Sequence, residues 1–180
     1  MIIIKRFFEL LKRSKVEICI SAAIFFVSVV VGIILLLVFP EISSDQKGNY
    51  IKDLAAMEII KNNIGVAFEL IIGGITLGLV TIVKLFMNGF VSGIMIGIHT
   101  QNYAISMILI KTVIHGFFEL IGIVICGGIG LKPLLFCIRG IKGQNINFKV
   151  QIKDSIVLLI FSIIFIVIGG LIEGLLLPMI

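Results

Sequence analysis

The chain has 180 residues, of which 59% are hydrophobic and only 14% are charged, and its mean hydropathy is +1.26. A soluble domain carries about 25% charged residues, so the composition excludes a water-soluble globular protein. It indicates a single membrane domain, residues 1–180, whose solvent is the lipid bilayer. The net charge of +5 does not indicate nucleic-acid binding, because the basic residues lie in short links between apolar runs.

Residues 1–17 are predicted to form an amphipathic helix on the cytoplasmic face of the membrane. Ile4, Phe7, Phe8 and Leu11 share one helical face and basic residues occupy the other, a pattern typical of helices that lie on anionic headgroups. An ordinary juxtamembrane connector is the alternative. Residues 18–39 then run without a charge and are longer than the apolar core of a cleaved signal peptide, so they are predicted to be the first span.

An outer loop, residues 40–63, is expected next, with a short helix over residues 51–61. Asn62 and Asn63 lead into a second predicted span, residues 64–83, which only Glu69 interrupts. About 20 apolar residues are enough to cross the hydrocarbon core.

The middle of the chain stays apolar for too long to be one span. A single polar break, residues 99–102, divides it, so the third span is placed at residues 87–98 and the fourth at residues 104–127. The third is short, and is therefore either tilted or half of a re-entrant hairpin. A basic cytoplasmic loop, residues 132–154, and a fifth span, residues 155–177, complete an all-α bundle of about five transmembrane helices.

Basic residues orient this arrangement. Eleven fall on one side of the predicted topology: Lys5, Arg6, Lys12, Arg13, Lys15, Lys84, Lys132, Arg139, Lys142, Lys149 and Lys153. The other side carries Lys47, Lys52 and Lys61. By the positive-inside rule, the N-terminus is expected in the cytoplasm and the C-terminus outside, in a multi-pass protein of the cell membrane.

Glycines spaced by four residues predict close helix packing, because backbones without side chains can approach each other. They lie in the second, third and fifth predicted spans: Gly74, Gly78, Gly89, Gly93, Gly97, Gly170 and Gly174. The pattern indicates a tight bundle or a homo-oligomer, without favouring a particular function.

Ionisable residues inside the membrane are the candidate functional site, because each is costly there. Lys111, His115 and Glu119 recur every four residues on the fourth span and share one stripe, while Glu69 and Glu173 lie on other spans. The set is either a structural network, a site for a partner or ligand, or a catalytic centre. A zinc site needs a third protein ligand and no catalytic motif is present, so we expect no metal, no cofactor and no enzymatic activity.

Short motifs in a fixed order carry a family resemblance. Lys61-Asn62-Asn63 precedes the second span and Asn88-Gly89 opens the third. His115-Gly116-Phe117-Phe118-Glu119 and a glycine-rich stretch at residues 127–131 follow, and Glu173-Gly174 closes the fifth span. Over residues 58–177 the chain resembles the stage II sporulation protein M family. Lys111 and Glu69 lie outside the motifs.

The resemblance implies a bacterial or archaeal membrane protein with no established catalytic activity. One branch of the family is similar to small proteins of circular bacteriocin clusters, which implies a subunit for export, maturation or immunity of a secreted peptide. The sporulation branch implies a scaffold that recruits peptidoglycan-remodelling partners, and an intramembrane metalloenzyme is the third alternative. The expected partners are the lipid bilayer, other membrane proteins such as an ABC-type transporter, the secreted peptide and a second copy of the chain.

The predicted topology can be tested by cysteine labelling. A cysteine at Asp45 should react with an impermeant reagent from outside, and one at Gln144 only after permeabilisation, because the two positions lie in loops on opposite sides. Labelling of position 144 in intact cells would contradict the topology.

Overall fold

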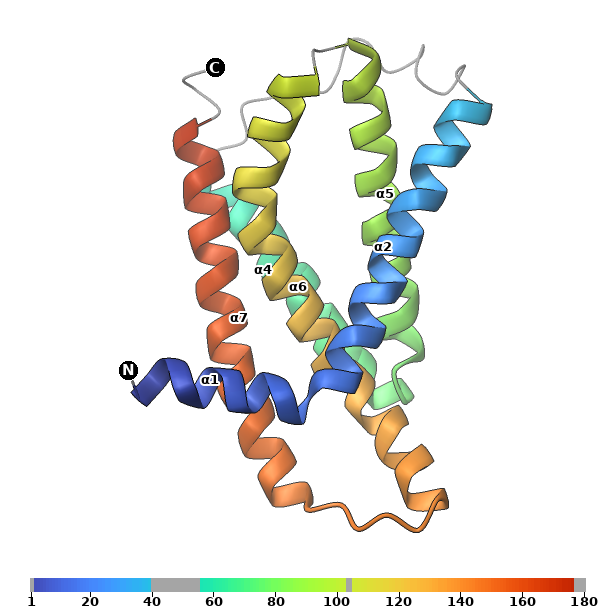
Figure 1. The fold of residues 1–180 in the computed structure, drawn as a ribbon, viewed down its shortest axis with the longest axis vertical. Coiled ribbons are helices and arrows are strands. Elements are labelled where there is room, and N and C mark those ends of the chain that lie inside the picture. Colours follow the sequence, from blue (N-terminus) through green and yellow to red (C-terminus); the bar gives the residue numbers. More distant parts are fainter. Residues whose placement is uncertain (1, 40–55, 103–104, 177–180) are drawn as a thin grey trace.

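The computed structural model describes residues 2–39, 56–102 and 105–176; side chains are described throughout these ranges except at residues 2–5, 56, 99, 101–102, 105–115 and 174–176. Every regular element within these ranges is helical. In chain order the elements are α1 (Ile2–Arg13), α2 (Lys15–Val38), α4 (Ala56–Ile72), the 3₁₀ turn η1 (Gly73–Thr76), α5 (Leu79–Asn102), α6 (Ile105–Ile141) and α7 (Phe148–Leu176). Figure 1 shows the long helices forming a bundle, with α1 lying across them.

Within the described residues, five helices are long and apolar enough to cross a membrane. Their spans are Lys15–Val38, Met57–Thr76, Leu79–Ile98, Gly116–Ile141 and Phe148–Glu173. The predicted all-α membrane bundle with about five spans is therefore confirmed. The first span agrees closely with the predicted residues 18–39, whereas the boundaries of the other four are shifted.

The largest shift comes from a turn between α4 and α5 that the sequence reading missed. Leu77 and Gly78 have positive φ angles of 53° and 83°, and their N–H groups donate to the carbonyls of Gly74 and Gly73, both at 3.1 Å. The hydroxyl of Thr76 also donates to Gly73 O, at 2.8 Å. Because the turn satisfies its own backbone groups, it needs few polar side chains. The predicted second span, residues 64–83, is therefore wrong: one helix ends and the next begins inside it.

The other boundaries follow from this turn. The third span, Leu79–Ile98, is a full 20 residues and not a short hairpin arm. The short outer helix predicted at residues 51–61 lies partly outside the described residues, and its described part is the start of α4, which runs without a break through Asn62 and Asn63.

Most of the predicted cytoplasmic loop at residues 132–154 is helical. Helix α6 continues through Pro133 to Ile141 and α7 begins at Phe148, so only residues 142–147 connect them. The basic residues that suggested a loop lie on the ends of two long helices. Figure 1 shows these ends projecting beyond α1 and the α4–α5 turn. We call this end of the bundle the basic end.

One turn of α6 is the crossing point of four helices. A Cβ atom on Gly127 would collide with Ser21 Oγ of α2 and lie 2.8 Å from Leu85 of α5, and one on Gly130 would collide with the Leu70 carbonyl of α4. Leu70 and Leu85 are completely buried. These glycines therefore let α2, α4 and α5 reach the backbone of α6.

A second glycine contact joins α2 and α5. A Cβ atom on Gly93 would collide with the Val29 carbonyl, one on Gly89 with the Phe25 carbonyl, and one on Gly32 with the Phe90 carbonyl. Since the collisions are with backbone, no side-chain rotation could relieve them. The two helices are therefore in backbone contact over about two turns.

Helix α1 is amphipathic, as predicted, and rests on the bundle at the basic end. Leu10 is buried in a small core with Leu158 of α7 and Ile125 of α6. The ring of Phe7 lies 4.5 Å from that of Phe161 and 6.0 Å from that of Phe165, both on α7. Figure 1 shows α1 running across the long helices and not along them.

The α2–α5 contact generates the first stability prediction. Gly93→Ala should lower the free energy of unfolding by about 1–3 kcal/mol, the usual cost of overpacking, because the new methyl group meets the Val29 carbonyl. Gly65→Ala on α4 is the control, since nothing lies within 4 Å of a Cβ there. Thermal unfolding in detergent measures both, and equal losses would contradict the backbone contact.

Candidate functional site

Three polar residues from three helices meet inside the bundle: Asn63 on α4, Glu119 on α6 and Glu173 on α7. The Asn63 side chain is within hydrogen-bonding reach of the Glu119 carboxylate, and Glu173 is close enough to act on Glu119 electrostatically. Oxygen Oε1 of Glu119 is buried and has no hydrogen-bond partner among the described residues. We call these three residues the acidic cluster.

Close helix contacts hold the cluster together. Gly122 lies one turn after Glu119, and a Cβ atom there would be 2.8 Å from the Ser162 carbonyl of α7. On α7, Gly170 lies one turn before Glu173 and faces Ile60 of α4, which would be 2.5 Å from its Cβ. Each of the three polar residues is thus one helical turn from a point where its helix touches another.

The chemistry of the acidic cluster depends on its two carboxylates, which belong to two apolar spans. An ionised carboxylate is costly in hydrocarbon, and a second one nearby adds repulsion. A proton or a cationic group would relieve both. Among the described side chains, no group of three His, Cys, Asp or Glu residues is placed to hold a metal ion. Chemically, a pair of carboxylates of this kind can take up a proton or interact with an organic cationic group.

Of the five ionisable residues singled out in the sequence, the structure brings Glu119 and Glu173 within electrostatic range of each other. His115 and Lys111 lie one and two turns before Glu119 on α6, but their side chains are outside the described residues. Participation of these two side chains stays a prediction.

Glu69 lies elsewhere. Its carboxylate is 2.7 Å from Lys84 Nζ, in a pair that joins α4 to α5. Glu69 therefore has an ion-pair partner of its own on α5.

The remaining motif residues do not gather at one site. Asn62 is exposed on α4, whereas Asn88 donates from its amide to the Lys84 carbonyl at 2.8 Å. Gly116 borders open space, with nothing within 4 Å of a Cβ.

The glycines expected to pack helices have different surroundings. Gly74 and Gly78 belong to the α4–α5 turn and face Gly130 and Leu131 of α6, and Gly97 faces Leu36 of α2. The surroundings of Gly174 are not among the described parts of the structure.

A second polar assembly, at the basic end, was not predicted. The Glu17 side chain is 1% exposed, and its Oε1 lies 2.8 Å from Arg139 Nη2. Lys132 is also buried and donates to Ser155 Oγ at 3.0 Å, and it is close enough to interact electrostatically with Glu17 and Asp154. These charges link the first turn of α2 to the ends of α6 and α7.

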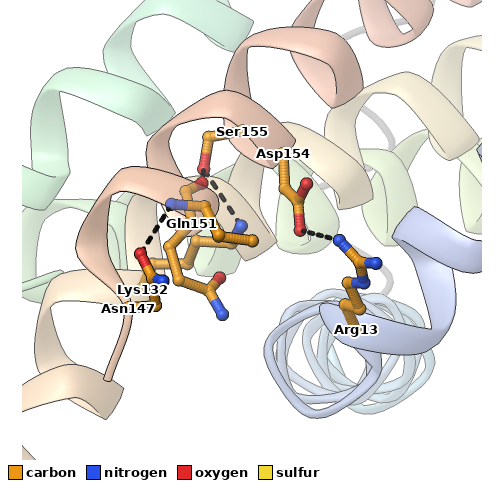
Figure 2. A network of polar contacts seen from close by, with 7 residues as sticks. Arg13, Lys132, Asn147, Gln151, Asp154 and Ser155 are labelled. Carbon is orange, nitrogen blue, oxygen red and sulfur yellow. Dashed lines mark hydrogen bonds and ion pairs between the residues drawn. The ribbon is translucent and has the colours of Figure 1, made fainter. Parts of the chain in front are cut away.

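Figure 2 shows the part of this assembly that includes α1. Arg13, at the end of α1, reaches Asp154 of α7 at 3.4 Å, and the Ser155 hydroxyl donates to the Gln151 carbonyl at 2.8 Å. Because removing one member of a buried ion pair leaves the other uncompensated, we interpret this assembly as structural.

One sequence signal could have revealed the assembly. Glu17 is spaced regularly with Ser21, Phe25, Ser28, Gly32 and Leu36, all buried on α2. A carboxylate in register with an interior stripe is unlike a solvated loop charge. Asp154 carries no comparable signal, because the helix that contains it was read as a loop.

Comparison with known proteins covers nearly the whole chain. Residues 21–178 match the family model described as Stage II sporulation protein M, so the region that contains the acidic cluster lies within the match. A relative from Methanocaldococcus jannaschii, itself described as an uncharacterized protein, is 31% identical over 166 residues, which cover 88% of this chain and 92% of the relative. No solved structure matches the chain.

A double-mutant cycle can test the electrostatic interaction between Glu119 and Glu173. Glu119→Gln and Glu173→Gln should be non-additive by about 0.5–3 kcal/mol in unfolding free energy, the range for residues in contact, because either change removes the same repulsion. Glu9→Gln on α1 is the control; Glu9 is exposed and lies on another helix, so its effect should add to that of Glu119→Gln. Additivity of the two cluster variants would show that Glu119 and Glu173 do not interact.

Proposed function

Because the chain belongs to the stage II sporulation protein M family, we propose that it is a non-enzymatic membrane subunit that assembles with other envelope proteins. The observation that carries the proposal is the acidic cluster. Asn63, Glu119 and Glu173 come from three helices, and the Glu173 carboxylate acts electrostatically on that of Glu119 within spanning segments. A site of this kind favours a cationic group, so we propose that it receives a lysine, an arginine or an amino terminus of a partner.

The finer proposal is that the partner is a secreted peptide during export, maturation or immunity. A peptide that crosses or enters the membrane brings cationic groups with it, and a carboxylate pair offers charge compensation where water is scarce. The chain itself supplies five spans, and the described segments that connect its helices are short. A subunit built in this way acts through its neighbours in the bilayer, and an ABC-type transporter is the kind of neighbour that would provide energy.

A sporulation-type scaffold is the second candidate, favoured by the description of the matched family. The two proposals differ in what lies next to the acidic cluster. A scaffold would contact membrane partners through its outer surface and would not need the carboxylates, whereas a peptide-handling subunit would need both.

The proposed orientation places the basic end in the cytoplasm. Helix α1 and the projecting ends of α6 and α7 carry most of the basic residues, and they lie at the same end (Figure 1). By the positive-inside rule this is the cytoplasmic side, and Glu173, near the far end of α7, then lies in the outer half of the membrane.

Site-specific photocrosslinking from native membranes tests the proposed function. A photoreactive residue replacing Phe117, which is 54% exposed beside the cluster on α6, should capture a membrane partner or peptide. We expect capture to fall at least fivefold in Glu119→Gln/Glu173→Gln and to be unchanged in Glu9→Gln. Capture of the same partner at full yield without the carboxylates would favour the scaffold, and a stoichiometric metal in the purified wild type that is lost in the double variant would favour a metalloenzyme.

A further inference from the structure

A half-exposed ion pair lies on the outer surface of the spanning helices, away from the acidic cluster. Glu69 Oε2 of α4 is 2.7 Å from Lys84 Nζ of α5, and the two side chains are 51% and 41% exposed. In a soluble protein such a pair would face water. Here both residues belong to spanning segments, so the exposed part of the pair would face acyl chains.

The depth of the pair follows from helix geometry. The spans Met57–Thr76 and Leu79–Ile98 have 20 residues each, which at 1.5 Å per residue equals the thickness of the hydrocarbon core, about 30 Å. Lys84 is five residues from the start of its span, about 8 Å along the helix. Glu69 is seven residues from the end of its span, about 12 Å along it when the 3₁₀ turn η1 is included. Both charges would be costly at this depth if lipid covered them.

Polar groups continue from the pair towards the middle of the membrane. Asn88 lies one turn further along α5, at intermediate exposure, and its amide donates to the Lys84 carbonyl at 2.8 Å. Val91, another three residues on, is 53% exposed. Residues spaced by three and four share one helical face, so α5 presents a mixed polar and apolar face outward while its glycines face α2.

We propose that this face of α4 and α5 is the interface with a second copy of the chain. Symmetric dimers bring the same patch of two subunits together around a two-fold axis. The patch defined by Glu69, Lys84, Asn88 and Val91 carries one charge of each sign, so it is complementary to itself. Two-fold pairing brings Lys84 of each copy within reach of the partner's Glu69 and replaces lipid by opposite charge. A partner with a single sign of charge would leave one member of each pair unmatched.

The proposal does not rest on the proposed function, because the patch contains no residue of the acidic cluster. It also differs from an oligomer built on the glycines. Gly89 and Gly93 are already covered by α2 of the same chain, so they are not available to a second copy.

Complementary charge reversals test the interface. Lys84→Glu leaves two acidic residues in the patch and Glu69→Lys leaves two basic residues. Each variant alone should dimerise at least fivefold less than the wild type, because like charges meet across the axis. Co-expressed with different tags, the two should recover each other in preference to themselves, and Glu69→Lys/Lys84→Glu in one chain should dimerise like the wild type. Single-molecule photobleaching in native-lipid nanodiscs counts the subunits.

Two further measurements guard against misfolding of the charged variants. The neutral pair Glu69→Gln/Lys84→Gln should stay monodisperse and lose dimer. In a Cys19→Ser/Cys137→Ser background, which removes the exposed thiols, Val91→Cys should form a disulfide-linked dimer in membranes, and Val27→Cys, 61% exposed on α2, should not. A wild type that is monomeric in the bilayer, or a neutral pair that dimerises fully, would overturn the proposal.

Discussion

The bundle depends on one turn of α6 that has almost no side chains. Three glycines of this turn touch neighbouring helices: Gly127 lies against Ser21, Gly128 against Ile18 and Gly130 against Leu70. A Cβ atom at any of the three would be within 3.0 Å of its neighbour. In lipid there is little hydrophobic drive to bring helices together, so close van der Waals contact and interhelical hydrogen bonds must do it. Thr81 supplies such a bond at the same place, donating from α5 to the Leu70 carbonyl of α4 at 2.8 Å. The crossing angles, and hence the positions of both polar assemblies, follow from this contact.

The sequence alone predicts the number of spans but not the residues at which they begin and end. Charge and hydropathy report which residues water can reach, and this property distinguishes bilayer from solvent. The turn at Leu77 and Gly78 is apolar because its N–H groups bond within the turn, so it resembles the middle of a span. The prediction made the opposite error at the ends of α6 and α7. Lys149 and Lys153 are exposed on α7, and in the sequence they resemble a hydrophilic loop.

The acidic cluster was only partly predictable for a related reason. The cost of a carboxylate in hydrocarbon identifies Glu119 and Glu173 from composition alone, but the same reasoning identifies Glu69, which instead pairs with Lys84. Which charges meet depends on helix rotation, and rotation is set by the glycine contacts. Asn63 was noticed as a motif residue, yet its contact with Glu119 required the knowledge that α4 passes through it as a helix.

The docking of α1 has a consequence for how the protein is made. The ribosome synthesises α1 before α7, which carries Asp154 and Phe161, and the paired residues Arg13 and Asp154 are 141 positions apart. Until α7 inserts, the apolar face of α1 lacks its contacts with α7 and can pack only against α6 and the membrane surface. Docking of α1 is therefore complete only after α7 has been synthesised, and a chain truncated before α7 would lack the α7 contacts that hold α1.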